Sequence, residues 1–282
     1  MRFTLTTILI ALMCSMLPLQ AQCPATPNIF QTSLLEAGQP GAEITTERLQ
    51  QILAAGSPPV LDVRFPQEYA ISHIPGAINI PPTSNTDVTS EVADITSRYP
   101  DRHTELVLTC NGPFCGKSKR VAAVLIAPPY NYDHIFRYQL GLPVWRALGN
   151  TVQTDLAGFA YIFNNDRNAV FVDARSPQDF AADTVACSVN VQPGEATAAN
   201  DDGRLPLLDK GTRIVVFAGD PQLAKKVAAE IAKKAYWSSS YFSGTFEDLQ
   251  NSRQINIHSR RRCHDAHGNS QHEDRDDEDG ER

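Results

Sequence analysis

The sequence predicts an α/β fold with two similar domains, each a central parallel β-sheet flanked by helices. Short apolar segments typical of buried strands alternate with segments of helical periodicity, and this alternation favours parallel α/β architecture. The order of segments in the first half of the chain recurs in the second half. The chain has 282 residues, 42% of them hydrophobic, which is enough to build two cores.

Strands and helices alternate clearly in the first half of the chain. A helix is predicted to begin near Thr45 and to stop at Gly56, since a glycine commonly ends a helix. The other predicted elements there are buried strands at 59–63 and 105–109 and helices at 87–99 and 118–126.

An internal repeat links the two halves. It indicates duplicated domains rather than a solenoid, because its period is too long for a stacked repeat. We expect the domains to span residues 44–149 and 150–252. The matched segments are Asp62-Val63-Arg64 with Asp173-Ala174-Arg175, Asn79-Ile80 with Asn190-Val191, 107–110 with 215–218, and Val121-Ala122-Ala123 with Val227-Ala228-Ala229.

Both ends of the chain differ in composition from the middle. Residues 1–21 begin with a basic residue, Arg2, continue with an apolar run and end in a small residue, Ala21. This is the layout of a cleavable signal peptide. Its run is short for a membrane span. We therefore expect a secreted or periplasmic protein with no span after signal removal. Residues 22–43 are expected to be a leader, and 253–282 a disordered tail rich in acidic residues and histidine, with weak metal binding as the alternative.

Charge and cysteine content exclude some functions. The formal net charge of −7 argues against nucleic-acid binding. Six cysteines are present, and Cys14 would leave with the signal, so an odd number remains. Their spacing resembles neither a disulfide framework nor a zinc site, and we predict no metal site and no cofactor.

Residues 61–81 contain a specific group of motifs. Leu61-Asp62-Val63-Arg64 is followed by Glu68-Tyr69 and by the segment 73–81, which begins His73-Ile74-Pro75-Gly76. Further on, residues 141–145 have the form Gly-x-x-x-Trp. Together these segments resemble the rhodanese family, over most of residues 44–148 and more weakly over 152–250. Ser72 stands where the family usually has glycine.

Most of these residues are expected to have structural roles. Arg64 and Glu68 are predicted to form an ion pair across the turn after the strand. Asp62 lies at the carboxyl end of a strand, where ligand sites of α/β folds collect, so supporting chemistry and capping both remain open for Asp62 and Arg64. His73 lies in a turn and is predicted to bind backbone groups, with a role as a base as the alternative.

Cys110 is the candidate nucleophile. It directly follows a predicted buried strand and precedes a glycine-containing loop that leads into a helix. Loop N–H groups and a helix N-terminus can stabilise a thiolate, whereas an inert buried cysteine lacks such surroundings. The predicted substrate-binding residues are Asn111, Gly112, Pro113, Phe114, Cys115, Gly116, Lys117 and Ser118.

The resemblance to rhodaneses implies the reaction. Cys110 would take the outer sulfur of thiosulfate or a related anionic donor, carry it as a persulfide, and pass it to cyanide or a thiol. Lys117 would help to bind the donor. In the family, four residues usually separate the cysteine from an arginine, whereas six separate Cys110 from Lys117. Cys115 in this longer loop could resolve a persulfide, form a disulfide with Cys110, or simply pack.

The second domain is predicted to be inactive. Ala218-Gly219-Asp220-Pro221 occupies the position of the cysteine loop, without a thiol, and Asp220 would repel an anion. Cys187 aligns with Gly76, far from this loop. This domain would support the first one, cover its cleft or bind a protein partner.

Three other functions remain open. One is a phosphatase, which the missing loop-ending arginine disfavours, because arginine grips phosphate in a bidentate manner. The second is a non-catalytic module that handles thiols or metals or binds a partner. The third is thiol–disulfide exchange through Cys110 and Cys115.

Overall fold

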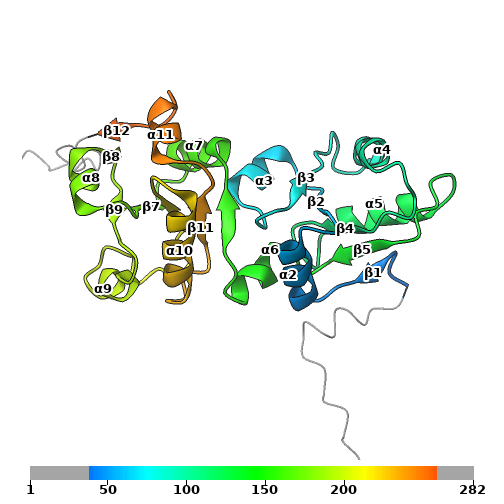
Figure 1. Ribbon diagram of the computed structural model, residues 1–282, viewed down its shortest axis with the longest axis horizontal. Coiled ribbons are helices and arrows are strands. Elements are labelled where there is room, and N and C mark those ends of the chain that lie inside the picture. Colours follow the sequence, from blue (N-terminus) through cyan, green and yellow to red (C-terminus); the bar gives the residue numbers. More distant parts are fainter. Residues whose placement is uncertain (1–37, 259–282) are drawn as a thin grey trace, which may run out of the picture.

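Two parallel sheets, each in its own lobe, organise the chain (Figure 1). The computed structural model describes residues 38–258. The first sheet has the order β1-β5-β4-β2-β3 and the second β6-β11-β10-β7-β9. The strands of the first sheet are β1 (Ala42–Glu43), β2 (Val60–Asp62), β3 (Ile78–Asn79), β4 (Leu106–Thr109) and β5 (Ile135–Tyr138). Those of the second are β6 (Val152–Thr154), β7 (Val170–Asp173), β9 (Val189–Asn190), β10 (Ile214–Phe217) and β11 (Ser239–Phe242).

The two sheets share one topology. Taken in chain order, the five strands of each sheet lie in the order first, fifth, fourth, second, third, and all neighbours are parallel. The predicted α/β class with two parallel, helix-flanked sheets is therefore confirmed.

Helices cover both faces of the first sheet. Along β4, Leu106 and Leu108 pack into one buried cluster with α4 and α5, whereas Val107 packs into another with α2 and α6. This alternation follows from the period of two in a strand. The helices of this lobe are α2 (Thr46–Ala55), α3 (Pro66–Ile71), α4 (Thr89–Arg98), α5 (Lys117–Ile126) and α6 (Gly141–Ala147).

The second lobe repeats this layering. Val216 of β10 packs with α9 and α10, and Phe217 packs on the other face with α7 and α11. A short antiparallel pair, β8 (Thr184–Val185) with β12 (Ile257–His258), adds to this lobe. Its helices are α7 (Leu156–Asn165), α8 (Pro177–Ala182), α9 (Ala196–Asp201), α10 (Pro221–Ala232) and α11 (Phe246–Asn251).

The lobes meet through α3 and the start of the second lobe. The His73 and Gln153 backbones form an isolated antiparallel bridge, and the Asp155 N–H donates to the Ala70 carbonyl at 2.8 Å. A Cβ at Gly158 of α7 would stand 2.0 Å from that same carbonyl oxygen. Only glycine therefore lets α7 approach α3 this closely.

The predicted ends of the folded region need correction. The expected leader, 22–43, ends in β1, which pairs with β5 and so belongs to the first sheet. The expected disordered tail, 253–282, begins with residues that fold, since Ile255 is buried and Ile257 pairs with Val185. The signal segment 1–21 and most of the tail lie outside the described residues. Between residues 38 and 258, no helix combines the length and apolarity needed to cross a bilayer.

Candidate active site

Cys110 lies at the centre of the carboxyl edge of the first sheet. It follows β4 directly, and β4 has β2 on one side and β5 on the other. The residue is only 4% exposed. The loop after it ends at Gly116, the residue before α5, so the helix N-terminus is directed to the loop. This position confirms the predicted strand–loop–helix arrangement.

The cysteine loop is folded back on itself. Cys110 and Cys115 form a disulfide, one of the alternatives that the sequence left open. The Cys115 N–H donates to the Gly112 carbonyl at 2.9 Å and closes a turn. The side-chain amide of Gln139, just after β5, donates to the Pro113 carbonyl at 2.8 Å. Gln139 thereby ties the loop to the neighbouring strand.

A cavity of about 410 Å³ opens beside this loop. Four of its lining residues come from the predicted set around Cys110: Asn111, Cys115, Gly116 and Lys117. Arg64 and Arg120 also line it, as does Glu68. Gly112, Pro113, Phe114 and Ser118 belong to the loop or to α5 but do not line the cavity, and the Phe114 side chain is fully exposed.

Arg64 is held by Asp62 and not by Glu68, so the predicted Arg64–Glu68 ion pair is wrong. The Arg64 Nε donates to Asp62 Oδ1 at 2.8 Å, and both side chains are nearly inaccessible to water. Glu68 instead accepts from the Phe65 N–H and, at 2.8 Å, from Asn111 Nδ2. The physical reason is burial, because a buried carboxylate such as Asp62 needs a partner more than Glu68 does.

The same pair recurs in the second lobe. Arg175 Nη2 donates to Asp173 Oδ2 at 2.8 Å. In both lobes an asparagine, Asn79 or Asn190, donates to the carbonyls of the two paired residues. The second lobe has this network but no cysteine loop. The network therefore has a structural role that does not depend on a catalytic cysteine.

Lys117 is largely buried and already has partners. Its ammonium donates to the Ser84 carbonyl at 2.6 Å and lies 3.6 Å from Glu91 Oε1, a carboxylate with no exposed surface. It also lies 4.7 Å from the centre of the Phe65 ring. Glu91 offsets much of the Lys117 charge, so this lysine contributes less attraction for an anion than a free cation would.

Arg120 is a cation at the cavity that the sequence reasoning missed. It is exposed, lines the cavity and donates to the Asn85 carbonyl at 2.8 Å. It lies three positions after Lys117 on α5, and residues at this spacing share a helix face. The three-residue spacing from Lys117 is the sequence feature that could have placed Arg120 beside the loop.

His73 binds backbone groups, as predicted. Its Nδ1 lies 2.8 Å from the Tyr69 carbonyl oxygen, and its ring stacks on the Tyr69 ring. Burial lowers the pKa of His73, while the hydrogen bond to Tyr69 and the charge of Asp155 act in the opposite direction.

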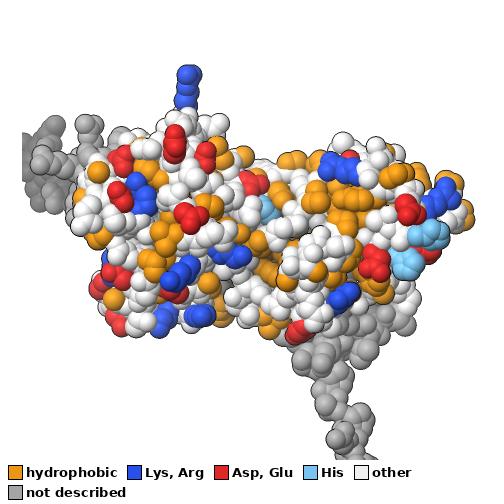
Figure 2. Space-filling model, in the orientation of Figure 1, with side chains coloured by type: hydrophobic (Ala, Val, Ile, Leu, Met, Phe, Trp, Pro, Cys, Tyr) orange, Lys and Arg blue, Asp and Glu red, His pale blue; other side chains and the backbone are white. Residues whose placement is uncertain are grey.

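The matching region of the second lobe has no cysteine. Ala218 follows β10 as Cys110 follows β4, and it is fully buried. Asp220 caps α10 by accepting from the Gln222 N–H at 3.0 Å. Cys187 is exposed in the turn between β8 and β9. On the face drawn in Figure 2, acidic and basic side chains are interspersed over this lobe.

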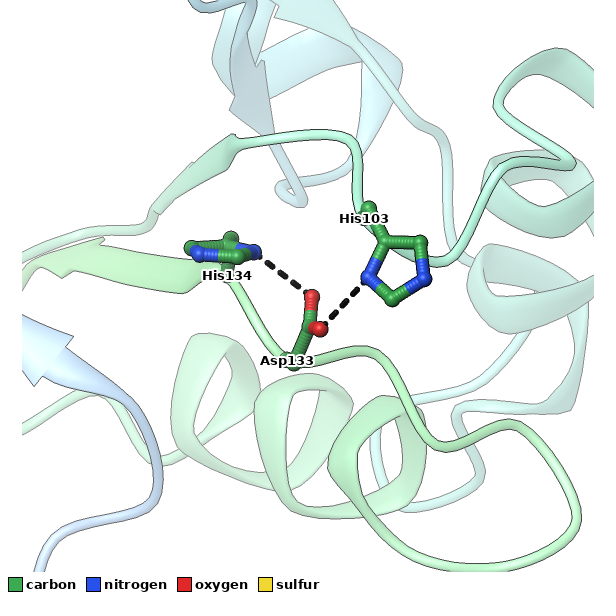
Figure 3. A group of neighbouring side chains, drawn as sticks. All are labelled: His103, Asp133 and His134. Atoms are coloured by element: carbon green, nitrogen blue, oxygen red, sulfur yellow. Dashed lines mark hydrogen bonds and ion pairs between the residues drawn. The ribbon is translucent and has the colours of Figure 1, made fainter.

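One group of side chains in residues 38–258 has the composition of a metal site. His103, Asp133 and His134 are exposed, and both imidazole Nδ1 atoms lie 2.6 Å from an oxygen of the Asp133 carboxylate (Figure 3). Imidazole and carboxylate are ligands that divalent transition metals accept. His103 precedes β4 and His134 precedes β5, so the group lies at the amino edge of the sheet, opposite the edge of Cys110.

The first lobe thus defines a class of protein, a parallel α/β domain with a cysteine loop between its central strand and a helix. Residues 45–148 match the family of the rhodanese-like domain, and this part of the chain is a rhodanese-like domain. The chain is also 35% identical, over 112 residues, to an HTH-type transcriptional regulator of Mycobacterium tuberculosis. That match covers 40% of this chain and 45% of the regulator.

Solved structures give more distant similarities. A thiosulfate sulfurtransferase from Pseudomonas aeruginosa is 19% identical and has a TM-score of 0.34, with 72% of this chain and 43% of that chain covered. A rhodanese with anions from E. coli is 27% identical and has a TM-score of 0.22, with 29% of this chain and 85% of that chain covered. The chain spans less than half the length of the regulator and of the Pseudomonas protein.

Proposed function

We propose that the first lobe is a sulfurtransferase that takes sulfane sulfur from thiosulfate or a similar anion onto Cys110. The observation that carries this proposal is the position of Cys110, between the end of the central strand and the N-terminus of α5, in a cavity with cationic side chains. A helix N-terminus stabilises negative charge, both on a thiolate and on the anion it attacks. Covalent chemistry of this kind needs no metal and no organic cofactor.

The cation that favours an anionic donor is Arg120. The Arg64 charge is neutralised by Asp62, and that of Lys117 is offset by Glu91. The Arg120 guanidinium donates to the Asn85 carbonyl, a neutral group, and no carboxylate among residues 38–258 forms an ion pair with it. A guanidinium suits sulfur oxyanions because its fork of N–H groups can meet two oxygens.

Sulfite release tests the proposal. The protein is first reduced and freed of reductant, and thiosulfate is then added. We expect about one sulfite per protein from the wild type, as Cys110 displaces it, and none from Cys110→Ser. Cys187→Ser, which changes an exposed cysteine outside the cavity, should match the wild type. Equal sulfite release from wild type and Cys110→Ser would refute the proposal.

Thiol–disulfide exchange is a second candidate, favoured by the Cys110–Cys115 disulfide. In that case the oxidised protein would oxidise a dithiol peptide without any sulfur donor. The reduced protein would then release no sulfite from thiosulfate. Sulfite release by the reduced wild type therefore distinguishes the two functions.

A further inference from the structure

The loop that carries Cys110 also places a second sulfur against it. The disulfide to Cys115 joins residues whose Cα atoms are 6.2 Å apart. Both cysteines line the same cavity. The turn between them is closed by the hydrogen bond from the Cys115 N–H to the Gly112 carbonyl. Cys115 is therefore placed to react with whatever group Cys110 carries.

Hydrogen bonds that involve no sulfur hold the loop in this shape. The Gln139 amide donates to Pro113 and also lies within 3.5 Å of the Gly112 and Cys115 carbonyl oxygens. The side-chain oxygen of Gln139, Oε1, accepts a hydrogen bond from the buried Arg137. Because none of these contacts involves a sulfur atom, we expect them to persist when the disulfide is reduced. The two thiols consequently stay close to each other in the reduced protein, as an intramolecular reaction requires.

We propose that Cys115 resolves the Cys110 persulfide, so that the domain releases its sulfur as hydrogen sulfide. This inference rests on the proposed sulfur transfer and names the internal acceptor. The Cys115 thiolate attacks the Sγ of Cys110, which is already bonded to the outer sulfur. A Cys110–Cys115 bond forms, and the bond between Cys110 and the outer sulfur breaks.

Atoms and electrons balance without an oxidant. The electron pair of the broken bond leaves on the outer sulfur. That sulfur takes up the proton that Cys115 released on forming its thiolate, and it departs as hydrosulfide. The sulfane sulfur is reduced, and the two cysteines are oxidised to the disulfide. An external dithiol then reduces that disulfide by exchange. The net reaction converts thiosulfate and a dithiol into sulfite, hydrogen sulfide and a disulfide.

A single turnover without added thiol tests the inference. The full chain is reduced, freed of reductant under anaerobic conditions, diluted to limit exchange between molecules, and treated with thiosulfate. Sulfite, sulfide and cyanide-removable sulfur on the protein are measured together. The variants are Cys115→Ser and, as a matched control, Cys187→Ser.

The outcomes separate this inference from the proposed function. We expect the wild type and Cys187→Ser to release one sulfide for each sulfite and to end as the disulfide. Cys115→Ser should release sulfite but retain its sulfur in a form that cyanide removes. If both the wild type and Cys115→Ser release sulfite and retain the persulfide, the role of Cys115 is overturned and the transferase proposal stands. If neither releases sulfite, the transferase proposal fails as well.

Discussion

The backbone of Gly141 lies directly against the backbone of Gly112. A Cβ at Gly141 would stand 2.5 Å from the Gly112 nitrogen and 2.8 Å from the Cys110 carbonyl oxygen. Gly141 also has a φ of +60°, which disfavours any other residue. The first residue of α6 thus supports the loop that carries the candidate nucleophile.

Gly141→Ala should cost both stability and activity. The left-handed backbone alone costs about 1–2 kcal/mol, and the overlap with Gly112 should add roughly 1–3 kcal/mol. Gly149→Ala is the matched control, because Gly149 has a φ of +80° but nothing within 4 Å of its added Cβ. Urea unfolding and sulfite release should both distinguish the variants. Equal losses in the two would show that the contact with the loop is unimportant.

Asp62→Ala should destabilise the first lobe strongly. It leaves the buried Arg64 without its carboxylate partner, and breaking a buried pair in this way costs about 3–5 kcal/mol. Asp94→Ala, which removes the half-buried partner of the exposed Arg98, should cost no more than about 0.5 kcal/mol. Denaturant unfolding measures both. A cost for Asp62→Ala as small as that for Asp94→Ala would contradict the burial argument.

Arg120→Gln should weaken donor binding more than it slows the chemistry. Loss of one exposed charge is worth up to about 1 kcal/mol, so the thiosulfate concentration for half-maximal sulfite release should rise roughly fivefold. Lys119→Gln removes the same charge from an exposed neighbour on α5 that does not line the cavity. It should have a smaller effect. If the two variants behave alike, Arg120 acts only through net charge.

Lys117 and Glu91 should show strong coupling. Lys117→Met leaves the buried Glu91 carboxylate without its cation and should cost about 3–5 kcal/mol. The double variant Lys117→Met/Glu91→Leu removes both charges and should recover much of that loss. The free energies of unfolding of both single variants and the double variant measure the coupling. Additive losses would mean that the two residues do not interact.

His73 should make stability fall in mild acid. Its pKa lies below the ordinary 6.5, chiefly because of burial, so below about pH 6.5 the unfolded chain binds a proton that the folded one does not. The contribution of His73 to the free energy of unfolding is complete above about pH 6.5, and it is lost as the pH falls toward the lowered pKa. The unfolding free energy of the wild type should therefore drop more than that of His73→Gln between about pH 7.5 and pH 5. If the unfolding free energies of the wild type and His73→Gln change in parallel with pH, His73 does not cause the loss of stability in acid.

The sequence was sufficient to predict the parts of the fold that depend on strong local signals. The segment from β4 to α5 combines an apolar strand, glycines and a periodic helix, so the position of Cys110 could be predicted. Strands β1 and β12 could not, because each has only two residues and its pairing depends on distant partners.

Side-chain partners were harder to predict. Arg64 has Asp62 and Glu68 nearby in the sequence, and only burial decides between them. Lys117 and Arg120 have the same charge in the sequence. Their difference arises from Glu91, which approaches Lys117 only in the folded chain. The Cys110–Cys115 contact could be stated as an alternative, and the hydrogen bonds of Gln139 that shape the loop lie beyond any local pattern.

Sulfur transfer to Cys110 can be tested by following the sulfur atom itself. Reduced Cys115→Ser protein, in which a persulfide cannot be resolved by Cys115, is treated with thiosulfate carrying a heavy isotope in its outer sulfur. Intact mass and peptide mapping then locate the label. We expect one labelled sulfur on Cys110, removed by cyanide and absent from Cys110→Ser. Unlabelled Cys110, or label on another residue, would contradict it.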